Sequence, residues 1–166
     1  MKRRLWLGVL ALAAISSGLG LYRFLVPTPE RIIRQRLNEV ARLASFAPNE
    51  GALAKAFNAQ KLSTRCTSDV ELVVTTPGHQ QIVNGRDELL ALALRARNSF
   101  SSLTLEFPDI LIVVASDKQS AVADLTARTK LGGEKEFDVR EFRCALKKID
   151  GEWLISRVES SRTLRD

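Results

Sequence analysis

The last third of the chain alternates apolar and polar residues in four segments that are separated by short turn sequences. The segments are residues 102–115, 120–131, 134–149 and 152–160, and the turns contain SDKQ, GG and DG. Alternation with a period of two predicts half-buried strands, and connections this short join antiparallel neighbours. The chain must therefore fold around an antiparallel sheet. Pro108, inside the first segment, predicts an edge strand or a β-bulge.

Two helices are predicted before this sheet. Thr28 can cap the first helix, and Pro29 suits its first turn. Asn49, in the segment APNE that ends this helix, can cap a second and shorter one. The first helix carries apolar residues at helical spacing, and the second carries three more: Ile33, Leu37, Val40 and Ala44, then Leu53, Ala56 and Phe57.

A hairpin and a third helix stand between these two helices and the four strands. Residues 67–76 and 80–84 have the composition of strands, and PGH makes the turn between them. Residues 84–100 carry acids in the first turn of a third helix, with Asn84 or Gly85 near its cap. The predicted order is helix, helix, strand, strand, helix and four antiparallel strands.

This order resembles the nuclear transport factor 2-like superfamily, of which SnoaL-like proteins are one branch. VNGRDELLALAL looks like that family's step from hairpin to helix, and LKKIDGEWLISRVES looks like its last hairpin, with the Trp after the turn. The resemblance covers residues 30–160. It implies an α+β fold in which about three helices cover a cone-shaped, curved antiparallel sheet, with the first strand beside the last. One such fold hosts many activities, so the resemblance speaks to fold rather than function.

An apolar segment precedes the predicted domain. Residues 5–22 are uncharged and span about 27 Å as a helix, enough for the hydrocarbon core of a bilayer. The bulky sequence LYRFLVPTPE after Gly20 is a poor cleavage site. We predict a retained transmembrane anchor over residues 1–26, a domain over residues 27–160 and a tail over residues 161–166. A cleaved signal helix ending near SSGLG and a cytosolic helix stay open as alternatives.

Most of the net charge of +6 is carried by residues in or beside this segment. Lys2, Arg3, Arg4 and Arg23 lie in or beside it, which leaves 21 basic against 19 acidic residues, or +2, for the rest of the chain. This balance argues against nucleic-acid binding. The basic start predicts a single-pass membrane protein with its N-terminus inside and its domain on the outer side, periplasmic or extracellular.

Two-residue turns set a register that assigns each side chain to a face of the sheet. The turn DG places Leu146 opposite Ile155, GG places Ala123 opposite Phe142, and DK places Ile112 opposite Ala123. The concave face then carries an apolar set that we predict to line a pocket: Ile112, Ala123, Phe142, Leu146, Trp153 and Ile155. Its polar members lie toward the strand ends, at Asp138, Arg140, Arg157 and Glu159. The candidate rim for an anionic or polar ligand is Arg140, Arg157 and Glu159.

The opposite face carries an outward apolar ridge. An exposed ridge of this kind predicts a homodimer through the sheets, which the resemblance also implies. Asp124 and Arg143, on neighbouring strands of this face, predict a structural ion pair. The ridge consists of Leu111, Val113, Val122, Val139 and Val158.

The inward face offers little for acid–base or metal chemistry. The resemblance implies enzymes that work inside the cone with Asp, Tyr or His, but the only Tyr is Tyr22 in the anchor and the only His is His79 in a turn. Cys66 and Cys144 are too few for a zinc site with one His. The resemblance sets their strands roughly 9–10 Å apart, beyond the usual disulfide limit, although a bond stays open if Cys66 precedes its strand.

We therefore predict a membrane-tethered, non-catalytic binding or scaffold domain that dimerises and uses no cofactor, metal or nucleic acid. Two alternatives stay open. One is a SnoaL-like enzyme acting on a small apolar substrate, which a convergent inward carboxylate in a closed pocket would favour. The other is an assembly subunit with envelope protein partners, because type IV secretion machines contain an inner-membrane component of this layout.

Overall fold

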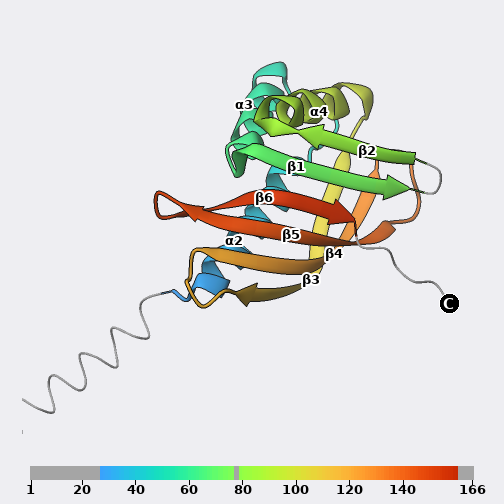
Figure 1. Cartoon of the computed structure of the whole chain (residues 1–166). Coiled ribbons are helices and arrows are strands. Elements are labelled where there is room, and N and C mark those ends of the chain that lie inside the picture. Colours follow the sequence, from blue (N-terminus) through green and yellow to red (C-terminus); the bar gives the residue numbers. More distant parts are fainter. Residues whose placement is uncertain (1–26, 77–78, 161–166) are drawn as a thin grey trace, which may run out of the picture.

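The computed structural model describes residues 27–76 and 79–160, shown in Figure 1. The predicted order of helices and strands is confirmed, and so is the α+β class. The predicted anchor and tail, residues 1–26 and 161–166, lie outside the described residues. None of the described helices is long and apolar enough to cross a bilayer. The elements are α2 (Pro29–Ala44), α3 (Ala52–Ser63), β1 (Cys66–Thr76), β2 (His79–Asn84), α4 (Gly85–Ser99), β3 (Leu103–Val114), β4 (Ser120–Leu131), β5 (Asp138–Ile149) and β6 (Glu152–Ser160).

The strands form one curved, six-stranded sheet in the order β2-β1-β6-β5-β4-β3 (Figure 1). The first strand lies beside the last, as the resemblance implies. β1 runs parallel to β6, whereas the other neighbours are antiparallel. The sheet is therefore mixed and not wholly antiparallel as predicted. The helix α4 carries the chain to the far edge at β3, and the returning meander brings β6 alongside β1 in the same direction.

The three helices close the concave side of the sheet. Thr28 caps α2 as predicted, since its hydroxyl accepts from the Arg31 amide at 3.4 Å. α2 places Ile33 and Leu37, both at most 1% exposed, in the main core. α3 and α4 lie together beside β1 and β2 (Figure 1). A second, smaller core cluster joins these two helices to the end of α2 through Leu43, Ala59, Leu62 and Ala93.

The second helix meets the core through residues other than those predicted. Gly51 is its N-cap, and Asn49 lies in the preceding turn with a φ of 65°, so Asn49 does not cap it. Leu53 and Phe57 are 85% and 63% exposed. The buried residues belong to the last turns of α3, because only that end of the helix reaches the second cluster; they are Ala59, Leu62 and Ser63.

The registers predicted from the DK and DG turns are confirmed. The register between β4 and β5 differs from the prediction by two residues, because Ala123 pairs with Cys144 and not with Phe142. Residues 132–137 form a longer connection in place of a two-residue GG turn, and Gly133 adopts a φ of 97° within it. A shift of two residues keeps every side chain on its predicted face.

A β-bulge in β6 places three residues on the face opposite to the one predicted. The register of β5 with β6 shifts by one residue at Ser156, whose hydroxyl donates to the Ala145 carbonyl at 3.2 Å. One inserted residue moves every side chain beyond it to the other face. Val158, predicted to face outward, faces the cavity. Arg157 and Glu159, predicted at the inward rim, lie on the outer face with the β5 residues they pair with.

β3 is an edge strand, and side chains of α2 and of its C-cap residue Ser45 bind to its backbone. Its register shifts around Pro108, so the predicted edge position and bulge are both confirmed. The guanidinium of Arg34 donates to the Ile110 carbonyl at 2.8 Å, and the Leu105 amide donates to the Ser45 hydroxyl at 3.0 Å. Contacts of this kind hinder the addition of another strand at β3.

Candidate functional site

An apolar cavity of about 270 Å³ lies between the concave face of the sheet and the helices. Five of the six strands and all three described helices contribute to its lining. From the helices come Leu37, Val40, Ala44, Leu62 and Leu89, and from the strands come Cys66, Val70, Leu72, Val74, Leu105, Phe107, Leu125, Ala127, Thr129, Phe142, Cys144, Ile155 and Val158.

The cavity occupies only one half of the predicted concave face. Phe142 and Ile155 line it as predicted. Ile33 of α2 packs into the other half, and Leu37 lies at the boundary, since it belongs to the main core and also lines the cavity. The remaining four predicted lining residues pack in or against the main core and do not line the cavity. These four are Ile112, Ala123, Leu146 and Trp153.

The cavity opens toward the end of the sheet where β4 stops and β5 starts. Its deep lining is buried, as at Cys66 and Leu125. The lining residues nearer the strand ends, such as Val74, Leu105 and Thr129, are half-exposed. The mouth of the cavity therefore lies beside the connection formed by residues 132–137.

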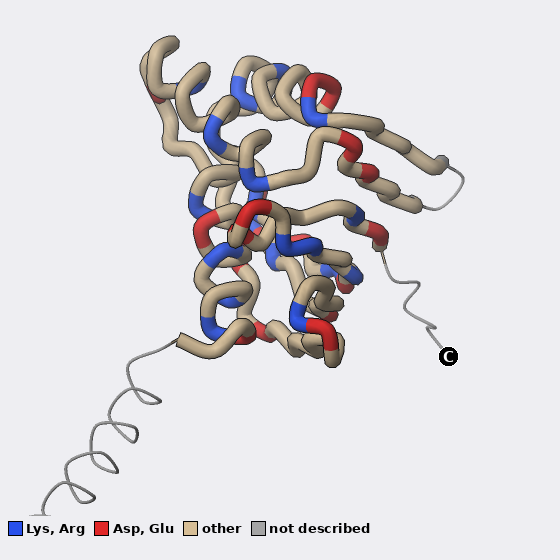
Figure 2. Tube along the Cα trace, turned by 60° about the vertical axis from the view of Figure 1, so that its left-hand side comes forward, with Lys and Arg blue, Asp and Glu red and all other residues tan. Residues whose placement is uncertain are grey.

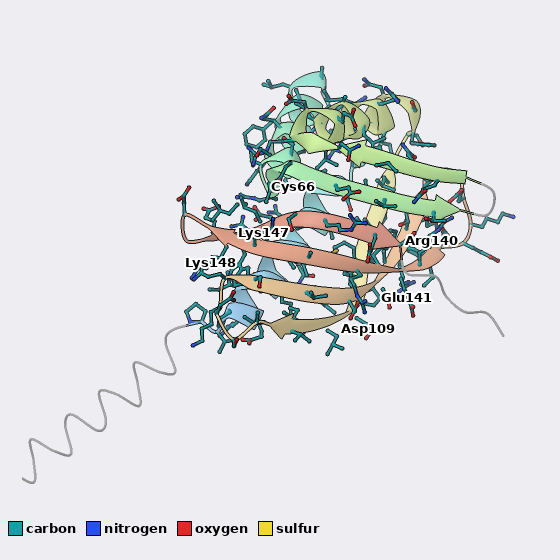
Figure 3. The ribbon with its side chains drawn as sticks, in the orientation of Figure 1. Cys66, Asp109, Arg140, Glu141, Lys147 and Lys148 are labelled. Atoms are coloured by element: carbon teal, nitrogen blue, oxygen red, sulfur yellow. The ribbon has the colours of Figure 1, made fainter. Side chains whose placement is uncertain are left out.

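Of the three residues predicted to form a rim, only Arg140 lies at this mouth. It pairs across the strands with the lining residue Ala127, and its Nε donates to an Asp138 carboxylate oxygen at 2.7 Å. Figure 3 shows Arg140 at one end of β5 and Lys147 and Lys148 at the other. The inward polar group is thus an ion pair at the mouth and not a set of three converging residues.

Arg157 and Glu159 belong to a row of charges on the outer face. Arg157 forms ion pairs with Glu71 of β1 and, at 3.0 Å, with Glu159. The predicted pair of Asp124 and Arg143 is confirmed at 2.8 Å. Exposed pairs of this kind contribute little free energy and are screened by salt. Acidic and basic positions are interspersed along the described part of the chain in Figure 2.

Cys66 and Cys144 line the cavity as free, buried thiols, so the disulfide left open by the sequence does not form. β6 lies between their strands, as the resemblance implies. Burial raises the pKa of the Cys66 thiol to about 11, an effect that the nearby Arg86 charge partly offsets. Burial also raises the pKa of the Cys144 thiol to about 12. Because the thiolate is the nucleophilic form, neither group is an activated nucleophile near neutral pH.

The cavity lining can enclose an apolar molecule but offers few groups for moving a proton. Apart from the two thiols, the Thr129 hydroxyl is the only polar side-chain group in the lining drawn from residues 27–76 and 79–160. General acid–base catalysis needs a titratable group within hydrogen-bond reach of the reacting atom. Within the same residues there is no cluster of three or more His, Cys, Asp or Glu that could hold a metal ion.

A buried ion pair outside the cavity is a feature that sequence reasoning missed. Arg97 of α4 is 2% exposed, and its Nε lies 3.2 Å from a carboxylate oxygen of Glu50. Arg97 also donates to the Leu43 carbonyl and lies over the Phe46 ring. The pair fastens the connection between α2 and α3 to α4. Arg97 lies four residues after the buried Ala93, so helical spacing could have placed it on the apolar face.

No family model matches the chain, and no curated protein matches it significantly. Solved structures do match it. A nuclear transport factor 2-like protein with a cystatin-like fold from Novosphingobium aromaticivorans is 18% identical with a TM-score of 0.63, and the match covers 93% of this chain and 92% of that one. A nuclear transport factor 2-like protein of unknown function from Pseudomonas putida is 12% identical with a TM-score of 0.59, covering 78% and 82%.

A third similar structure, also from Novosphingobium aromaticivorans, is provisionally named a scytalone dehydratase. It is 17% identical with a TM-score of 0.56, and the match covers 81% of this chain and 84% of that one. Identities this low show the fold alone. The described domain therefore has the cystatin-like fold of the nuclear transport factor 2-like proteins.

Proposed function

We propose that the chain is a membrane-tethered, non-catalytic domain that binds a small apolar molecule between its sheet and its helices. The observation that carries this proposal is the cavity of about 270 Å³ with its almost wholly apolar lining. An engineered apolar cavity of about 150 Å³ binds benzene. Scaling from that case, this cavity suits a ligand of about ten carbon atoms.

The proposed membrane tether is based on the sequence of residues 1–26. Their apolar stretch is long enough to span a bilayer, and the basic residues at its start favour an N-terminus inside. The domain then lies on the outer side of the membrane, where an envelope protein is a further candidate partner. N-terminal sequencing of the mature protein tests the tether, and a start near residues 19–24 would contradict it.

The enzyme alternative has less support. One similar structure bears the provisional name of a dehydratase, but its identity to this chain is 17%. The described lining of the cavity holds no carboxylate that could act as a base on a bound substrate. Binding without turnover is the function that this lining suits best.

Filling the cavity is expected to abolish ligand binding. Ala127 is 4% exposed and lies in the lining, so Ala127→Phe should occupy the space of the ligand. We expect the affinity for 2-naphthalenemethanol, a neutral bicyclic probe, to fall at least about tenfold, at a cost of about 1–3 kcal/mol in stability from overpacking. Isothermal titration calorimetry of the full-length chain measures the affinity.

Val122→Phe is the matched control, because Val122 lies on the same strand but on the outer face and is 40% exposed. This variant should bind the probe as the unmodified chain does. A full-length chain that binds no probe, or an Ala127→Phe variant that is folded and binds it normally, would contradict the proposal.

We also propose that the outer face of the sheet associates with a second copy of the chain. Leu111 and Val113 are 66% and 62% exposed, and Val113 pairs across the strands with the exposed Val122. The neighbouring Asp124 and Arg143 neutralise one another. Val158 faces inward, so the apolar surface is smaller than predicted.

Val113→Lys is expected to weaken this dimer at least about tenfold, because a charge would be desolvated in an apolar contact. Sedimentation velocity of the full-length chain over a range of concentrations measures the association. Leu53→Lys is the control, since Leu53 is an apolar residue that is 85% exposed but belongs to α3 and not to the outer face of the sheet. If the chain stays monomeric at every concentration, the proposed dimer is wrong.

A further inference from the structure

We infer that the cavity mouth recognises an anionic head group, so that the ligand is a small apolar carboxylate with its ring or chain in the cavity and its carboxylate at Arg140. This inference rests on the proposed function, because it needs the cavity to hold the apolar part. It adds the chemical class of the ligand and the residue that selects it.

The position of Arg140 supports this class. Arg140 and Asp138 pair across the strands with Ala127 and Thr129, and both of these partners line the cavity. Side chains opposite one another on a sheet share a face and have Cβ atoms about 4.5–5.5 Å apart. The ion pair therefore stands at the open end of the cavity, next to its half-exposed lining.

Arg140 keeps hydrogen-bonding capacity for a ligand. Its Nε donates to Asp138 at 2.7 Å, whereas its two terminal nitrogens make no hydrogen bond within the described part of the chain. A guanidinium presents its donors as a planar fork that matches a carboxylate. A carboxylate of the ligand can therefore bind Arg140 while Asp138 stays bound to it, or can displace Asp138 from Arg140.

The other cations of these strands either lie on the outer face or are far from the mouth. Arg128 and Lys130 alternate with the lining residues of β4, and both lie over the Phe137 ring, at 4.4 and 5.5 Å from its centre. Lys148 is on the inward face, but at the opposite end of β5 (Figure 3). Among the described residues of the sheet's inward face, Arg140 is thus the cation nearest the opening.

The test compares two ligands that share one ring system. We expect Arg140→Gln to weaken 2-naphthoate about two- to fivefold, the range for a partly exposed charge pair, and to leave 2-naphthalenemethanol unchanged. Asp138→Asn should strengthen 2-naphthoate by a similar factor, because it removes the competing and repelling carboxylate. Calorimetry of the full-length chain and of the two variants at low salt measures the six affinities, and added salt should reduce the effect of each substitution.

Arg157→Gln is the matched control. Its side chain is 44% exposed against 41% for Arg140 and is also ion-paired, but it lies on the outer face. It should change neither affinity. If the alcohol binds and 2-naphthoate responds equally to Arg140→Gln and Arg157→Gln, or to neither, the carboxylate class is wrong and the apolar site stands. If neither ligand binds the unmodified chain, the proposed function fails and the inference fails with it.

Discussion

Trp153→Ala is expected to lower the free energy of unfolding by about 3–5 kcal/mol. Trp153 is 1% exposed and belongs to the main core, together with Ile33 and Leu37 of α2. Close-packed surroundings relax only partly around a missing side chain, so the lost contacts and the new void both count against the folded state. Domains are stable by about 5–15 kcal/mol, so this single change removes a large fraction of the total.

A denaturant titration of the full-length chain measures this cost. Lys148→Ala is the control, because Lys148 pairs with Trp153 across the β5–β6 hairpin but is exposed. Its effect should stay within about 0.5 kcal/mol. A cost below about 1 kcal/mol for Trp153→Ala would mean that this side chain is not in the core, and that the register of the last hairpin is wrong.

Arg97→Met is expected to destabilise the domain by about 3–5 kcal/mol, although it replaces a charged side chain with an apolar one of similar length. The substitution leaves the Glu50 carboxylate, whose side chain is 11% exposed, without its cation. It also leaves the Leu43 carbonyl without its donor. A buried charge without a partner costs far more than a broken exposed pair.

A second substitution separates charge from packing. Adding Glu50→Gln to Arg97→Met removes the uncompensated charge and keeps an acceptor for Asn58, which donates to Glu50 at 2.8 Å. The double variant should therefore be more stable than Arg97→Met alone. Arg95→Met, an exposed position on the same helix, should cost no more than about 0.5 kcal/mol. A double variant no better than the single one would mean that the ion pair does not carry the effect.

The order of elements and the faces of most strands could be predicted because their signals are local. Thr28 and Pro29 mark the start of α2, and alternation of apolar residues marks β3 to β5. The DG turn alone places Trp153 on the buried face. The predicted register between β4 and β5 was wrong by two residues, but the assignment of side chains to faces stayed correct because the strand period is two.

The candidate site could not be predicted to the same depth, because it depends on a β-bulge and on tertiary packing. The bulge at Ser156 exchanges the faces of Val158 and Arg157, and its one trace in the sequence is that the inward apolar residues Ile155 and Val158 lie three positions apart and not two. The position of the cavity depends on how far α2 fills the concave face with Ile33 and Leu37. That filling is a tertiary property, which turns and alternation do not encode.

A crystal structure of the full-length chain with 2-bromonaphthalene bound tests the central claim most directly, because the anomalous signal of bromine locates the ligand without ambiguity. The account predicts one bound molecule in contact with Phe107, Phe142 and Val158, surrounded by apolar side chains of the described domain. A ligand bound elsewhere would contradict it. So would a ligand held between an enclosed carboxylate and a hydrogen-bond donor opposite, which is the arrangement that a SnoaL-like enzyme needs.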